Sequence, residues 1–209
     1  MLSLVVLAVL VAGASPLPAD TRTRKQPSET PPLDCCMPLA LQAAVIDLKS
    51  DEELVTIVAV DYENKLEGFW TTWAATGELD SHMMFDYNQG VLYEAVYDPG
   101  EPPACNKLSL DLPWIRCMND SGINELTYLG SNTVGMKGNG IDYHEFSYRV
   151  KDFEVKVALT SLPGDKNLCY PVLESIKNNE LSTTFIYLDV ETEIKDHHVL
   201  SVPELCVGL

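Results

Sequence analysis

The stretch Phe153-Glu154-Val155-Lys156-Val157-Ala158-Leu159 indicates the fold class of this chain. Its apolar residues at every second position alternate with Glu154, Lys156 and Ala158, and a period of two residues is typical of a strand that buries one face. The run 54–60 is continuously rich in Val and Ile, which predicts a strand that is covered on both faces. Other strand-like runs, with alternating Leu or with many β-branched and aromatic residues, are 83–85, 91–97, 107–112 and 181–190.

Turn signals separate these runs. Asn88-Gln89-Gly90, Asp98-Pro99-Gly100 and Pro163-Gly164-Asp165 are combinations typical of turns, and glycines at 135, 138 and 140 interrupt the middle of the chain. Because such signals recur about every 8 to 14 residues and amphipathic helices are scarce, the sequence favours a mostly antiparallel all-β domain. The piece 203–206 fits either a helical turn or an extended tail.

Length and charge limit the class of protein. The chain has 209 residues, which fits one domain or two at most at roughly 150 residues per domain. It carries 14 Lys and Arg residues against 31 Asp and Glu residues, a formal net charge of −17. Nucleic-acid binding needs clustered Lys and Arg side chains, so we expect no nucleic-acid partner. Hydrophobic residues make up 46% of the chain, enough for a sizeable core.

The first 34 residues differ in composition from the rest. Residues 2–11 are almost all Leu and Val, and Ala12-Gly13-Ala14 has the small-residue spacing of a signal-peptidase site. The run is too short to cross a bilayer of about 30 Å, so we expect no transmembrane segment. We interpret residues 1–14 as a cleaved signal peptide, with a buried N-terminal helix as the alternative. Residues 15–34 are predicted to be a Pro-rich disordered arm, and the folded, extracellular domain is expected at 35–209.

Six cysteines in a secreted chain indicate a disulfide framework. They are Cys35, Cys36, Cys105, Cys117, Cys169 and Cys206. Six cysteines allow 15 pairings; adjacent Cys35 and Cys36 do not pair easily with each other, so each is expected to have a separate partner. Asn119-Asp120-Ser121 is a sequon for N-glycosylation, which we expect on a surface loop.

Catalytic and metal-binding motifs are absent from the sequence. It contains no G-x-S-x-G elbow, P-loop or H-E-x-x-H, and the glycines at 135, 138 and 140 favour a tight turn over a phosphate loop. His197 and His198 are neighbours that would face opposite sides of a strand, so zinc binding would need other ligands. Residues 61–65 lack the spacing of an EF-hand. The acidic charge indicates either a solvated surface or weak calcium binding without identifiable ligands.

Short motifs follow one another over most of residues 35–206. They are Cys35-Cys36-Met37-Pro38, Tyr87-Asn88-Gln89-Gly90-Val91-Leu92-Tyr93, Cys105-Asn106-Lys107-Leu108-Ser109-Leu110 with Pro113-Trp114, Cys169-Tyr170-Pro171-Val172, and 181–185 continuing through Ile194-Lys195-Asp196 to Pro203 and Cys206. In this order they resemble the opening C-x-x-P, the central hairpin, the C-x-K-x-x-L strand and the C-Y-P-V motif of the ependymin and ependymin-related family.

The resemblance implies two curved antiparallel sheets that form a half-open barrel with a deep apolar cleft, a shape shared with bacterial periplasmic lipoprotein carriers. It further implies a secreted glycoprotein, often dimeric, that is linked to calcium binding and cell–matrix adhesion and holds a lipid or another hydrophobic ligand in the cleft. Asn119 falls where related proteins have a sequon.

The resemblance also implies a disulfide pattern, in which Cys35 pairs with Cys169 and Cys105 with Cys206. The chain departs from vertebrate ependymin-related members, which have a cysteine just before the strand at 83–85 and its partner in a C-terminal tail. This chain has Ser81 and His82 at the first position and stops at Leu209. We therefore suggest that Cys36 and Cys117 pair with each other in place of that bridge.

Two functions follow as hypotheses, and neither is enzymatic. The first is a carrier that binds a lipid or fatty acid in the cleft, because a curved, unclosed sheet leaves apolar side chains for a ligand to cover. The alternative is a calcium-binding adhesion or matrix protein that uses its acidic surface. Trp70 and Trp73 lie three positions apart, so at most one of them should face the cleft. The candidate cleft residues, for each of which ordinary core is the alternative, are Phe69, Trp70, Trp73, Phe85, Tyr93, Tyr97 and Phe185.

Overall fold

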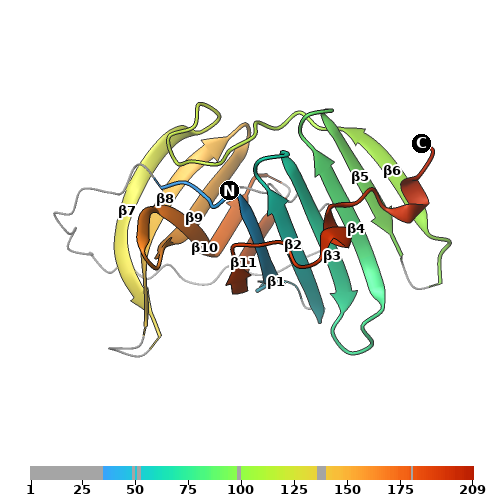
Figure 1. The fold of residues 1–209 in the computed structure, drawn as a ribbon, viewed down its shortest axis with the longest axis horizontal. Helices are drawn as coiled ribbons and strands as arrows, with labels where there is room; N and C mark the ends of the chain where they lie inside the picture. Colours follow the sequence, from blue (N-terminus) through green and yellow to red (C-terminus); the bar gives the residue numbers. More distant parts are fainter. Residues whose placement is uncertain (1–34, 49, 51–52, 98–99, 136–139, 180) are drawn as a thin grey trace.

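The computed structural model describes residues 35–48, 50, 53–97, 100–135, 140–179 and 181–209. The expected signal peptide at 1–14 and the Pro-rich arm at 15–34 lie outside the described residues. Eleven strands form one antiparallel sheet in the order β6-β5-β4-β3-β2-β1-β11-β10-β9-β8-β7 (Figure 1). The terminal strands β6 and β7 each pair with one neighbour, so the sheet is not closed into a barrel.

Most runs with strand-like periodicity are strands. The strands are β1 (Ala40–Asp47), β2 (Leu54–Asp61), β3 (Leu66–Trp73), β4 (Leu79–Asp86), β5 (Val91–Val96), β6 (Ala104–Ser109), β7 (Asn124–Val134), β8 (Ile141–Val150), β9 (Phe153–Leu162), β10 (Asp165–Lys177) and β11 (Ser182–Glu191). The predicted all-β class with antiparallel pairing is confirmed.

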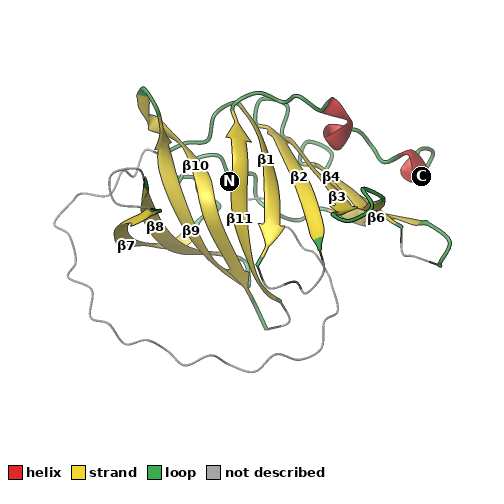
Figure 2. Cartoon of the chain, turned by 90° about the horizontal axis from the view of Figure 1, so that it is seen from below, coloured by secondary structure: helices red, strands yellow, loops and turns green. Residues whose placement is uncertain are grey.

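The sheet consists of two meanders that meet in the middle. Strands β1–β6 (the first half) and β7–β11 (the second half) each pair in chain order, and the two halves join through the β1–β11 pair, where Val45 lies opposite Tyr187. Figure 2 shows that the sheet arches, with β7 and β6 at the two ends of the arch. The two curved sheets implied by the resemblance are therefore two halves of one continuous, half-open sheet.

The strand register gives the sheet an inner and an outer face. In β9, Val155, Val157 and Leu159 are buried while the side chain of Lys156 is exposed, as the alternating sequence predicts. Cross-strand partners share a face, and the register links Val157 through Glu174 to Phe185 in the second half. We define the inner face, the concave side of the arch, by the side chains of Phe69, Phe85, Phe146, Val157 and Phe185.

One end of the inner face is covered by the segment 110–123. Ile115 and Met118 are buried in the core, and the Trp114 ring packs against Tyr62 with 5.1 Å between ring centroids. The strand predicted over 107–112 ends earlier, at Ser109. The Leu110 N–H still donates to Gly90 O at 2.8 Å, and the chain then leaves the sheet. Because Leu110 and Leu112 pack against the core outside the strand, the alternating pattern of leucines continues beyond the end of β6.

The C-terminal segment covers part of the outer face of the first half. It contains two short 3-10 helices, η1 (His197–Leu200) and η2 (Glu204–Cys206), so residues 203–206 form a helical turn and not an extended tail. Val199 and Leu200 pack on Ala59 of β2, whose neighbours Val58 and Val60 are buried on the inner face. The continuous apolar run of β2 thus reflects burial on both faces.

Three disulfides join segments that are distant in the sequence. Cys35 pairs with Cys169, Cys36 with Cys117, and Cys105 with Cys206. These are the two pairings that the resemblance implies and the third that we suggested for the remaining cysteines. The adjacent cysteines therefore connect the start of the domain both to β10 and to the segment 110–123. No helix among the described residues is long and apolar enough to cross a membrane.

Candidate functional site

The inner face carries one apolar cluster that runs through both halves of the sheet. Large side chains such as Phe85 and Phe146 are almost fully buried, at 1% and 0% exposure. Strands of the first half contribute Leu41, Val58, Phe69, Met83 and Phe85, and strands of the second half contribute Phe146, Tyr148, Val155, Val157, Ile176 and Phe185. The curvature of the sheet brings these distant segments into a single core.

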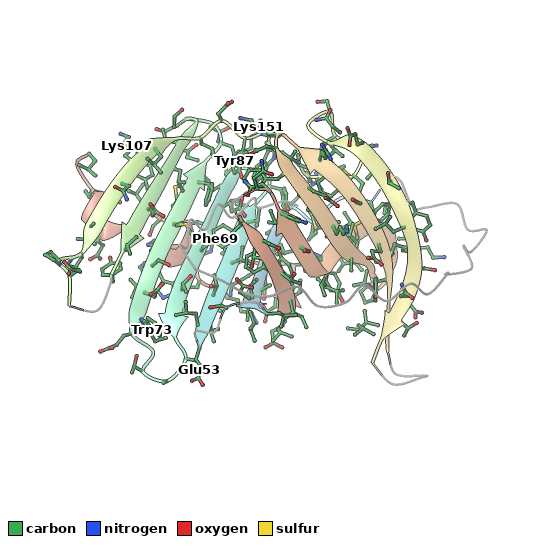
Figure 3. The ribbon with its side chains drawn as sticks, turned by 180° about the vertical axis from the view of Figure 1, so that it is seen from behind. Glu53, Phe69, Trp73, Tyr87, Lys107 and Lys151 are labelled. Atoms are coloured by element: carbon green, nitrogen blue, oxygen red, sulfur yellow. A yellow bond between two sulfur atoms is a disulfide. The ribbon has the colours of Figure 1, made fainter. Side chains whose placement is uncertain are left out.

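Four of the seven predicted cleft residues lie on the inner face. Phe69, Phe85 and Phe185 belong to the buried cluster, and the rings of Phe69 and Phe85 meet edge to face with 5.7 Å between centroids. Trp73 lies four positions after Phe69 on β3 and therefore on the same face. It is half-buried at the end of the strand, opposite Leu54. Figure 3 shows Phe69 in the middle of β3 and Trp73 near the strand's end.

Trp70, Tyr93 and Tyr97 correct the prediction, because they lie on the outer face. The Trp70 ring lies beside His82 under the C-terminal segment, tilted by 56° and with 5.0 Å between ring centroids. The Lys107 ammonium lies 5.5 Å from the centroid of the Tyr93 ring. The pKa of Tyr97 is raised by partial burial and by the negative charge of Glu204 in η2. Aromatic character marks burial, but only the strand register decides which face a ring occupies.

A glutamate stands in the middle of the apolar inner face. Glu67 of β3 is 1% exposed and lies opposite Phe85. The Tyr87 hydroxyl donates to its Oε2 at 3.0 Å. The pKa of the Glu67 carboxyl is raised to about 8, chiefly by burial; the Tyr87 hydrogen bond opposes this rise, and the charge of Glu174 adds to it. A carboxyl in an apolar environment holds its proton because ionisation there lacks solvation.

A second glutamate repeats this arrangement in the second half of the sheet. Glu174 of β10 is also 1% exposed and lies between Phe185 and Val157 in the ladder. The Tyr187 hydroxyl donates to its Oε2 at 2.7 Å. Burial raises the pKa of the Glu174 carboxyl to about 7, partly offset by this hydrogen bond. Each half of the sheet therefore contributes one buried carboxyl that is held by one tyrosine.

Three polar atoms of this cluster have no hydrogen-bond partner among the described residues. They are Glu67 Oε1, Glu174 Oε1 and the hydroxyl oxygen of Tyr148. Tyr148, on β8, is 1% exposed, and its pKa is raised well above the ordinary value by burial and by the charge of Glu174. Buried polar atoms in folded proteins are almost always paired, so this group is chemically unusual.

The sequence analysis missed these polar residues, although a signal for them exists. Glu67 precedes Phe69 by two positions and Glu174 precedes Ile176 by two, so each glutamate shares the face of a buried apolar residue. We interpreted the acidic residues together as a surface property, and the register was needed to separate these two from the others.

The predicted glycosylation site and the buried histidine of β4 lie away from the inner-face cluster. Asn119 is exposed in the turn that follows Cys117, where an attached glycan would meet solvent. His82 is buried on the outer face, with Nε2 3.2 Å from Val199 O. Among the described residues, no group of three or more His, Cys, Asp or Glu side chains is arranged to hold a metal ion.

Comparisons with known proteins give one informative match. No curated protein matches the chain. Solved structures that are similar include PNGF-II, at 10% identity and a TM-score of 0.38 over 78% of this chain and 29% of that one, and a LolA superfamily protein from Nitrosomonas europaea, at 10% identity and a TM-score of 0.36 over 81% and 94%. The chain thus spans less than a third of the length of PNGF-II. The family model described as Ependymin matches residues 76–206, more than half of the sequence. The chain belongs to the ependymin family.

Proposed function

We propose that this protein is a secreted, non-catalytic glycoprotein that binds a lipid or another hydrophobic small molecule on the inner face of its sheet. One observation carries the proposal: a single apolar cluster covers the inner face of a sheet that is not closed. Membership of the ependymin family supports it. Ligand sites are predominantly apolar with a few polar groups, and the inner face has this composition.

The margins of the inner face support access for a ligand. Leu108 of the edge strand β6 lies opposite Leu92 of β5 and therefore on the inner face, and it is 48% exposed. Trp73, at the end of β3, is half-buried. An apolar surface that continues from the core to an exposed edge gives a hydrophobic molecule a place to bind without crossing a polar barrier.

Secretion and glycosylation are parts of the same proposal. Three disulfides in one domain are typical of an oxidising compartment. Asn119 is exposed in a turn, as an acceptor of a glycan must be. A mass increase of the secreted chain that is lost in Asn119→Gln would support the glycan.

The binding function is tested by native mass spectrometry of the chain purified from a secretory host, before and after delipidation. We expect an additional mass of a few hundred daltons that is lost on extraction with organic solvent and regained when the extract is returned. A bare mass at every stage, with no uptake of added lipid, would contradict the carrier function.

The net charge of −17 favours a second candidate, a calcium-dependent adhesion or matrix protein that uses its acidic surface. Carboxylate oxygens are ligands that calcium prefers. Sedimentation with calcium and with a chelator separates the candidates: chelator-sensitive self-association without bound lipid supports this function, and calcium-independent behaviour opposes it.

A further inference from the structure

The polar groups inside the apolar inner face point to the head of a ligand. Glu67 Oε1, Glu174 Oε1 and the Tyr148 hydroxyl each have no hydrogen-bond partner among the described residues, and all three side chains are 1% exposed. A buried polar atom without a partner destabilises the folded state, because it has lost its hydrogen bonds to water and gained none in the protein. Three such atoms in one core are a cost that a bound polar group would remove.

The three residues form one electrostatic cluster, although they come from different strands. The charge of Glu174 acts on the carboxyl of Glu67 and on the Tyr148 hydroxyl. The pKa of Tyr187, whose hydroxyl donates to Glu174, is also raised by interactions with Glu67 and Tyr148. The cluster therefore spans β3 of the first half and β8, β10 and β11 of the second half, and it lies where the two halves face each other.

We propose that Glu67, Glu174 and Tyr148 bind the ammonium head of a single-chain amphiphilic amine whose tail lies along the apolar inner face. This inference rests on the proposed function, and it specifies the chemical class of the ligand. Tyr87 and Tyr187 are positioning residues, because each donates to one carboxyl and leaves the other oxygen of that carboxyl free.

Charge and hydrogen-bonding capacity favour an amine over other head groups. An ammonium has three N–H donors and no acceptor, and the three unpaired oxygens can all accept. The ion pairs of the described residues do not include Glu67 or Glu174. The carboxylate of a fatty acid would bring a negative charge next to the ionisable carboxyl of Glu174, and an alcohol has one donor for three acceptors.

The test compares three ligands that share a tail and differ in the head: dodecylamine, dodecanol and dodecanoate. Calorimetric titrations of the delipidated full chain are made below the micelle concentrations at pH 7.4, in about 150 mM salt to screen the acidic surface. We expect dodecylamine to bind one molecule per chain at least about ten-fold more tightly than dodecanol, since hydrogen bonds that involve charged groups are stronger than those between neutral groups.

Variants separate the head site from the acidic surface. Glu67→Gln combined with Glu174→Gln keeps side-chain size and should weaken dodecylamine at least about ten-fold while leaving dodecanol within about two-fold, and Tyr148→Phe should weaken the amine by a smaller factor. Glu63→Gln removes an exposed carboxylate in the turn after β2 and serves as the matched control, with no change expected. Retained dodecanol binding shows that a variant is folded.

The outcomes are distinguishable. Equal binding of all three ligands, or an amine preference that survives in the double variant, would overturn the head site while the hydrophobic-ligand function stands. Binding of none of them would overturn the head site and count against the proposed function as well. Loss of amine binding in Glu63→Gln to the same extent as in the double variant would show attraction by the surface alone.

Discussion

A carboxyl in an apolar core makes stability depend on pH. The pKa of Glu67 rises from 4.5 to about 8 in the folded state, chiefly through burial. Between these values the folded protein holds a proton that the unfolded chain has released, so stability falls as pH rises through this window. The carboxyl of Glu174, with a pKa of about 7, contributes in the same direction between pH 4.5 and 7.

Glu67→Gln tests this dependence. Above pH 8 the amide removes the cost of a buried charge, so we expect the variant to be more stable than the parent by about 2–4 kcal/mol at pH 8.5. At pH 4.5, where the parent carboxyl is protonated in the folded state, the difference should be below about 1 kcal/mol. Urea unfolding at both pH values measures it, with Glu63→Gln as control. A difference that does not change with pH would contradict the buried titration.

Gly68 is required by close packing between a strand and the C-terminal segment. A Cβ at this position would lie 1.8 Å from the carbonyl oxygen of Val199 in η1, which is backbone and cannot rotate away. We expect Gly68→Ala to destabilise the protein by about 1–3 kcal/mol, the range for overpacking. Urea unfolding measures the loss; a variant as stable as the parent would show that η1 does not pack on β3 in solution.

At the scale of elements, the alternating and continuous apolar runs predicted strands well. The pattern of 153–159 gives both the strand β9 and its buried face, and the run 54–60 gives β2 with cover on both faces. The pattern at 107–112 predicted the end of the strand three residues too late. Leucines in a segment that leaves the sheet can pack on the same core as leucines in a strand.

The composition of the candidate site was harder to predict. Aromatic residues indicated the inner-face residues Phe69 and Phe85 correctly, yet the same reasoning selected Tyr93 and Tyr97, which the register places outside. Glu67 and Glu174 were not selected, because an acidic residue is exposed far more often than buried. Which face of the sheet such a side chain occupies depends on the partner strands and on the register, and the sequence of one strand alone shows neither.

The C-terminal segment is an element that depends on its disulfide. Cys105–Cys206 joins it to β6, in addition to the packing of Val199 and Leu200 on Ala59 and bonds such as Lys107 Nζ with Leu209 O at 2.8 Å. Removing a disulfide from a small secreted domain costs about 2–5 kcal/mol. In Cys105→Ser combined with Cys206→Ser, we expect faster hydrogen exchange in residues 197–206 and in β5 and β6.

Hydrogen exchange in the second half of the sheet is the internal control for this prediction. The helices η1 and η2 lie against strands β2–β6 of the first half, so the protection of β8–β10 in the second half should persist. Exchange that accelerates equally across all strands, or not at all in 197–206, would contradict a specific contribution of this disulfide to holding the segment.

At the scale of the whole molecule, the net charge of −17 opposes compactness. Repulsion between like charges on the surface is screened when salt shortens the Debye length from about 30 Å at 0.01 M to about 10 Å at 0.1 M. We expect the thermal unfolding temperature to rise with NaCl over this range. A fall would mean that attractive ion pairs, such as Lys151 with Asp111, outweigh the repulsion.

The single β1–β11 pair between the two halves has a consequence for the order of folding. Within each half, neighbouring strands are consecutive in the chain and can pair through short hairpins. The union of the halves instead needs residues from opposite ends of the domain, and the disulfide Cys35–Cys169 spans 134 positions at the same boundary. Because closing a long loop is entropically slower than zipping local hairpins, each meander is expected to form early, and the chain then becomes one body when its first and last strands meet.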